Sequence, residues 1–72
     1  MEPSSQVLAK RIADSVALIL QAKGLKQADL ARASGISQPT VSRAMRGGYW
    51  SVELLLAAAR LCGVTTDHLL GR

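Results

Sequence analysis

The sequence has 72 residues, 49% of them hydrophobic, and Tyr49 and Trp50 are its only residues of the Phe, Trp and Tyr types. This length allows one small domain over residues 1–72, which would bury only about 60% of the surface that its unfolded chain exposes. Nine Lys and Arg residues against five Asp and Glu give a net charge of +4, which favours nucleic acid or an anionic membrane surface as a partner.

Several classes of protein are excluded by the same composition. The single cysteine, Cys62, cannot form an internal disulfide, and no cluster of Cys and His has the spacing of a metal site. No stretch approaches the roughly 18 apolar residues of a membrane span, and the first residues lack the pattern of a secretion signal. We therefore expect a cytoplasmic protein without a membrane partner, in which Cys62 is a small buried residue.

Glycines divide the chain into five pieces of helical length, and no window alternates apolar and polar residues as a strand would. The first helix is predicted from Ser4 or Ser5 to about Lys23, and Gly24 is expected to end it in the left-handed conformation. Its buried face should carry apolar residues that recur every three or four positions: Leu8, Ile12, Val16 and Ile19.

The next two predicted helices are short. One spans about residues 27–34 and is stopped by the glycine that follows it. The other follows Ser37, whose hydroxyl we expect to accept the amide hydrogen bond of Thr40 as an N-cap. This third helix is expected to end at Met45 or Arg46.

Two further helices complete the chain. Ser51 has the side chain of an N-cap and should begin the fourth helix, which Gly63 would end. Thr65 or Thr66 is expected to begin a short last helix that runs through Leu70. Between the third and fourth helices, the loop is expected to place Trp50 in the core.

Residues from Gln27 to Arg46, QADLARASGISQPTVSRAMR, have the pattern of two helices joined by a tight turn. Ala31 is small where the two helices would cross, and Gly35 can adopt the positive φ of the turn. Four apolar residues would fill the angle between the helices: Leu30, Ile36, Val41 and Ala44. This segment resembles the helix-turn-helix of the phage repressor and Cro family, also called the XRE-like family.

The resemblance extends over roughly residues 12–71, which leaves 5–11 as an N-terminal extension of the first helix. It implies an all-α, five-helix, lambda-repressor-like DNA-binding domain. The chain departs from the family at Lys26, where relatives have a capping Ser or Thr. It departs again at Leu20 and Met45, where relatives have a basic and an acidic residue that pair; two apolar residues in their place should be neutral or stabilising.

In this family the second helix of the motif lies in the major groove. The resemblance therefore implies that the helix over about residues 38–46 reads bases, through Ser37, Gln38, Pro39, Ser42 and Arg43. The amide of Gln38 suits adenine, the guanidinium of Arg43 suits guanine, and the ring of Pro39 suits a thymine methyl group. Seven residues are expected at the sugar-phosphate backbone: Lys26, Gln27, Thr40, Arg46, Gly48, Tyr49 and Ser51.

The function that the resemblance implies is a sequence-specific DNA-binding transcriptional regulator in the nucleoid of a bacterium or phage host. We expect a repressor that binds a pseudo-palindromic operator in double-stranded DNA as a homodimer. The dimer contact is expected at Val64, Thr66, His68 and Leu69. An antitoxin or protein-interaction adaptor with the same fold is the alternative, although the polar residues at positions 37, 38, 42 and 43 argue against a pure adaptor.

An enzyme is the weakest interpretation of the sequence. No nucleophile stands in an activating elbow, no phosphate-binding loop is present, and so small a domain offers no obvious pocket. We therefore expect no catalytic residue, no metal, no cofactor and no small-molecule substrate.

Overall fold

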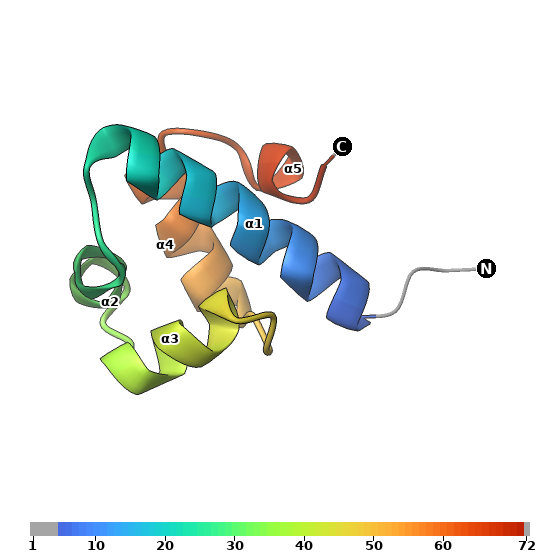
Figure 1. Cartoon of the computed structure of the whole chain (residues 1–72), viewed down its shortest axis with the longest axis horizontal. Helices are drawn as coiled ribbons and strands as arrows, with labels where there is room; N and C mark the ends of the chain where they lie inside the picture. Colours follow the sequence, from blue (N-terminus) through green and yellow to red (C-terminus); the bar gives the residue numbers. More distant parts are fainter. Residues whose placement is uncertain (1–4, 72) are drawn as a thin grey trace.

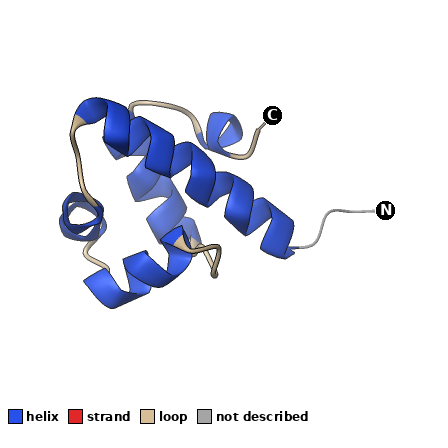
Figure 2. Ribbon diagram, in the orientation of Figure 1, coloured by secondary structure: helices blue, strands red, loops and turns tan. Residues whose placement is uncertain are grey.

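The computed structural model describes residues 5–71, which form five helices and no strand (Figures 1 and 2). The helices are α1 (Ser5–Lys23), α2 (Gln27–Ser34), α3 (Gln38–Met45), α4 (Val52–Cys62) and α5 (Thr66–Leu69). This confirms the all-α prediction and its five helices. Ser4, the other start considered for α1, lies outside the described residues.

Most of the predicted helix ends are confirmed. Gly24 and Gly63 end α1 and α4 with φ of 71° and 72°, in the left-handed region that favours glycine. The Ser51 hydroxyl accepts the Leu54 amide at 3.1 Å, as an N-cap does. The Thr65 hydroxyl does the same at the start of α5.

The predicted cap of α3 is wrong in its chemistry. Ser37 occupies the N-cap position, but its hydroxyl accepts no amide hydrogen bond. It lies instead 2.8 Å from the Thr40 hydroxyl, with which it forms a hydrogen bond. The partner of the Ser37 hydroxyl is thus the Thr40 hydroxyl and not the Thr40 amide. Hydrogen bonds from Ser and Thr side chains often compete in this way with those of the helix backbone.

Asp29 supplies the cap that Lys26 cannot give to α2. An ammonium group has no lone pair and cannot accept an amide hydrogen bond. The Asp29 carboxylate accepts the Lys26 amide at 2.8 Å, as the third residue of a capping box does. The carboxylate also stands in the first turn of the helix, where the dipole favours a negative charge.

The core joins all five helices around a stripe on α1. Ile12 and Val16 are buried as predicted, whereas Leu8 and Ile19 are only half-buried. The stripe is wider than predicted, because it also includes Ala9, Ala13 and Leu20. The buried residues of the other elements are Leu30, Val41, Ala44, Trp50, Leu54, Ala58, Ala59, Cys62 and Leu69.

Leu20 and Met45 belong to this core, as their apolar character predicts. Leu20 is buried, and Met45 is half-buried and packs against the cluster. Cys62 is buried as well, and burial raises the pKa of its thiol, while the nearby charge of Lys23 acts in the opposite direction.

The helices are arranged so that α3 and α5 lie on opposite sides of α1 (Figure 1). Helix α2 contacts both α3 and α4, and α1 contacts α3, α4 and α5. Within residues 5–71, every helix is too short or too polar to cross a membrane. One side of α3 remains exposed, as do Arg46 and Tyr49 in the loop that follows it.

Candidate nucleic-acid interface

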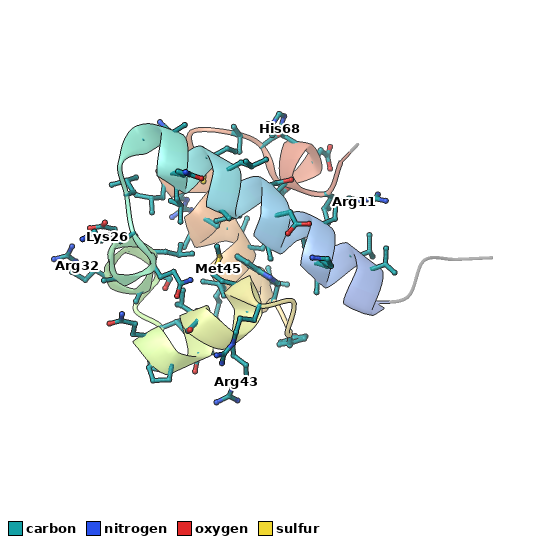
Figure 3. The ribbon with its side chains drawn as sticks, in the orientation of Figure 1. Arg11, Lys26, Arg32, Arg43, Met45 and His68 are labelled. Atoms are coloured by element: carbon teal, nitrogen blue, oxygen red, sulfur yellow. The ribbon has the colours of Figure 1, made fainter. Side chains whose placement is uncertain are left out.

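Helix α3 divides into a buried side and an exposed side. Val41 and Ala44 are 0% and 1% exposed and hold the helix to the core. Five residues at its start and on its outer side are exposed: Ser37, Gln38, Pro39, Thr40 and Arg43. Ser42 is half-buried. The fold thus presents the predicted base-reading residues on one short helix, with Arg43 pointing away from the domain (Figure 3).

The turn between α2 and α3 fixes the start of this helix. Gly35 has a φ of 71° and donates its amide to the Ala31 carbonyl at 2.9 Å. The Ile36 amide donates to the Ser34 hydroxyl at 3.2 Å, so the turn satisfies its own polar groups. Pro39 falls within the first turn of α3, as predicted, where the missing N–H has no intrahelical partner to lose.

The loop after α3 binds back onto the end of the helix. The Gly48 amide donates to the Arg43 carbonyl at 3.0 Å, and the indole Nε1–H of Trp50 donates to the Ala44 carbonyl at 3.0 Å. Trp50 is buried, which confirms its predicted place in the core. A Cβ atom on Gly48 would lie 2.7 Å from the Arg43 oxygen, so only glycine fits without a shift of backbone.

This internal hydrogen bond bears on one residue of the predicted interface. Gly48 was expected to bring its backbone close to the DNA backbone, but its amide hydrogen is already donated to Arg43. Gly48 therefore has no free amide hydrogen to donate to a phosphate, and its contact with the DNA backbone stays a prediction. Sequence reasoning missed the Gly48 and Trp50 hydrogen bonds; the signal available for both was a Gly-Gly pair followed by two aromatic residues.

Three positively charged side chains, before α2, on α3 and just after it, remain available to an anionic partner. Lys26, Arg43 and Arg46 are exposed, and among the residues that the structure describes none of them forms an ion pair. Arg32, by contrast, pairs with Asp29. The amide hydrogen bond from Lys26 and, after it, the Arg32 side chain hold the pKa of the Asp29 carboxyl below its ordinary value of 3.8.

The remaining predicted backbone contacts lie between α3 and α4 and at the start of α2. Tyr49 is 81% exposed, and its hydroxyl is free to donate within the described chain. The Ser51 oxygen accepts the Leu54 amide but keeps its own hydrogen for a further acceptor. Gln27 is half-buried at the first position of α2. No hydrogen bond joins it to Gln38 within residues 5–71.

The predicted dimer contact is wrong at Leu69. This side chain is 0% exposed and fills the core between α1 and α4, so it cannot reach a partner. Val64 and Thr66 are half-buried, and His68 is exposed. His68 and Arg43 lie at opposite edges of the molecule in Figure 3.

Comparison with known proteins agrees with this geometry. A model of the helix-turn-helix family matches residues 16–69. A crystal structure of a hypothetical transcription factor, NHTF, from Neisseria is similar, with a TM-score of 0.78 and 28% sequence identity over 97% of this chain and 82% of that one. No curated protein matches the sequence. From the matched residues and the five-helix fold, the chain belongs to the XRE-like helix-turn-helix family of DNA-binding transcription regulators.

Proposed function

We propose that this protein is a sequence-specific transcriptional repressor that inserts α3 into the major groove of a pseudo-palindromic operator. The observation that carries this proposal is the division of α3, which buries Val41 and Ala44 and exposes a polar, base-competent side. Helix-turn-helix proteins place this helix against base edges while the preceding helix crosses the DNA backbone.

Within this proposal the exposed residues have separate roles. Gln38 and Arg43 read bases, because an amide can bind adenine N6 and N7 and a guanidinium can bind guanine O6 and N7. Arg46, in the loop, contacts phosphate and positions the domain without reading sequence. Arg32 also lies exposed on α2, but its ion pair with Asp29 makes it a weaker candidate for a phosphate contact than Lys26, which is unpaired among the described residues.

Selection from random DNA tests the proposed function directly. The purified protein should enrich one motif, and Arg43→Ala should weaken its binding by about 1–3 kcal/mol and relax the preference at one position. Arg46→Ala should weaken all sequences alike and reduce the salt slope by about 1. Arg60→Ala, on the exposed face near the end of α4, is the matched control for lost charge.

Two results of the selection would count against the proposal. An unchanged base preference in Arg43→Ala would remove the base-reading role from that residue. If the wild-type protein enriches no motif, the protein-interaction adaptor replaces the repressor as the favoured function. A preference that changes in Arg60→Ala as much as in Arg43→Ala would show only an effect of net charge.

We further propose that the repressor binds as a dimer, through the exposed part of the segment from Val64 to His68. A palindromic site should then bind cooperatively, with half-sites about 10–10.5 base pairs apart or a multiple of that spacing. His68→Glu would place two like charges close to the twofold axis and should reduce this cooperativity without changing affinity for a single half-site. Equal affinities for the palindrome and the half-site in the wild-type protein would refute the dimer.

A further inference from the structure

The last turn of α3 accepts hydrogen bonds from four donors of the loop that follows it: the amides of Arg46, Gly47 and Gly48 and the indole of Trp50. The four C-terminal carbonyls of a helix have no intrahelical amide to bind. The Arg43 and Ala44 carbonyls each accept one amide of the immediate turn, from Arg46 and Gly47. Each also accepts a donor from farther along the loop, the Gly48 amide and the Trp50 indole, at 3.0 Å. The end of the helix is thereby tied to residues outside it.

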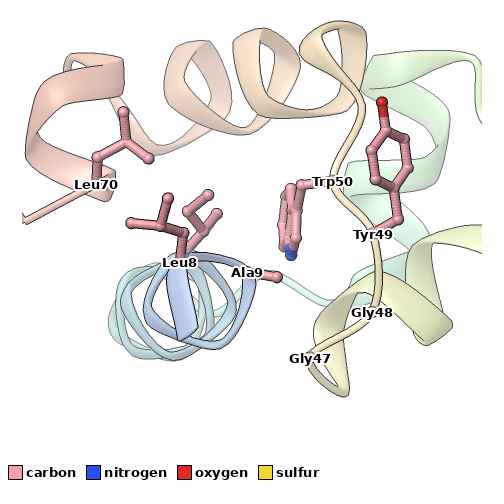
Figure 4. A pocket seen from close by; sticks show the side chains of 8 residues that line it. Leu8, Ala9, Gly47, Gly48, Tyr49, Trp50 and Leu70 are labelled. Carbon is pink, nitrogen blue, oxygen red and sulfur yellow. The ribbon is translucent and has the colours of Figure 1, made fainter. Parts of the chain in front are cut away.

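The indole donor lies between α3, to which it is hydrogen-bonded, and the residues of α1. Trp50 lines an apolar groove of about 410 Å³ together with Leu8, Ala9 and Ile12 of α1 and Leu70 after α5. Figure 4 shows its ring standing beside the loop, with Ala9 close to its nitrogen-bearing edge. Because the ring is packed against α1, its hydrogen bond places α3 relative to the rest of the domain.

Gly48 fixes the same end of α3 by a steric contact. The loop passes so close to the helix that a Cβ at this position would lie 2.7 Å from the Arg43 oxygen and 3.3 Å from its carbonyl carbon. Both of these atoms are backbone and cannot rotate away. A side chain at position 48 must therefore push the end of α3 outward or displace the loop.

These contacts bear on Arg43 more than on any other predicted base-reading residue. Arg43 supplies one of the two anchored carbonyls, and the next residue, Ala44, supplies the other. A bidentate contact between a guanidinium and guanine needs both the distance and the plane of the side chain to be correct. A small rotation of α3 about its axis changes both.

We propose that Trp50 and Gly48 are positioning residues for DNA recognition, which set the orientation of α3 from its C-terminal end and so decide how Arg43 meets its base. This inference rests on the proposed function. Neither residue needs to touch DNA for this role. The two act through the backbone carbonyls of the helix that carries the reading side chain.

Trp50→Phe is the first variant, because it keeps an aromatic ring and removes the indole N–H. The groove beside the ring is open, so the smaller side chain leaves no sealed cavity. A good bidentate contact supplies about 5- to 150-fold discrimination between bases, and the variant should lose about five- to tenfold of it at the position read by Arg43. Affinity for non-specific DNA should stay within about twofold, since phosphate contacts dominate that binding.

Gly48→Ala is the second variant and should move the same base preference in the same direction. Gly24→Ala is its matched control, because position 24 has a φ of +71° and nothing within 4 Å of an added Cβ. The control is destabilised by strained backbone but has no contact with α3. At a temperature where all variants are folded, it should keep the wild-type ratio of specific to non-specific affinity.

A double-variant cycle separates positioning from general destabilisation. If Trp50 acts through Arg43, then Trp50→Phe should change the preference at that base in the wild-type background and leave it unchanged in Arg43→Ala. Additive changes in the two backgrounds would overturn the proposal. So would an unchanged preference in both Trp50→Phe and Gly48→Ala while the wild-type protein still selects a motif.

Hydrogen exchange in the free protein gives a readout that does not need DNA. In Trp50→Phe the Gly48 amide should exchange about five- to tenfold faster, while the amide of buried Leu30 keeps its wild-type rate. If the wild-type protein selects no motif, the proposed function fails. Unchanged exchange of the Gly48 amide in Trp50→Phe would refute the anchoring, whatever the result of the selection. Faster exchange at Leu30 to the same degree would show global loosening and would equally contradict the proposal.

Discussion

Replacing Ser51 by alanine isolates the contribution of one hydrogen bond at the start of α4. The Ser51 oxygen accepts the Leu54 amide at 3.1 Å, which satisfies one of the amides that a helix leaves without a partner at its N-terminus. Loss of such a cap costs about 1 kcal/mol, within a range of about 0.5–2 kcal/mol. For a domain of this size, that corresponds to a fall in Tm of about 4–8 °C.

Thermal unfolding followed by circular dichroism at 222 nm measures this change, and Ser37→Ala is its matched control. Both serines stand at N-cap positions, but only the Ser51 hydroxyl accepts an amide hydrogen bond. The loss of an exposed hydroxyl at position 37 should change stability by less than about 0.5 kcal/mol. Ser51→Asp, which keeps an acceptor, should stay near the wild-type Tm. If Ser37→Ala lowers the Tm as much as Ser51→Ala, the assignment of caps is incorrect.

Two further predictions concern titratable groups. The pKa of Asp29 is lowered by folding, so its stabilising effect is present above its ordinary pKa of 3.8 and is lost as the pH falls through the folded value. The Tm of Asp29→Asn should therefore lie below the wild-type Tm at pH 7 and converge with it in acid; a constant gap from pH 7 to pH 2 would contradict this. Cys62 is buried with a raised pKa, so it should react with a thiol reagent at pH 8 only at the rate of unfolding. Rapid labelling of the native protein would show that the thiol is accessible.

Helix positions were predictable because their ends are encoded locally. A left-handed residue after a helix is most often glycine, and Gly24, Gly35 and Gly63 adopt that conformation here. The width of the α1 stripe was not predictable from large apolar residues alone. Ala9 and Ala13 contribute little to a pattern of hydrophobicity, but their small size allows close packing against neighbouring elements.

The candidate site was predictable where it depends on helix periodicity and unpredictable where it depends on contacts between elements. The exposed positions of α3 follow from the burial of Val41 and Ala44, which recur at helical spacing. The Trp50 hydrogen bond joins a side chain to a carbonyl six residues earlier, across a loop of unknown path. Leu69 has the same apolar character whether it faces the core or a partner, and only packing against α1 and α4 decides between them.

The exposure of one side of α3 has a consequence for how the target of the proposed repressor can change. Val41 and Ala44 are the fully buried residues of this helix, whereas Gln38, Pro39, Thr40 and Arg43 are exposed. Substitutions on a surface of this kind usually change stability by less than about 0.5 kcal/mol. Under the proposed function, recognition of a new DNA sequence can therefore be acquired by successive single substitutions on the exposed side of α3, with each intermediate variant still folded.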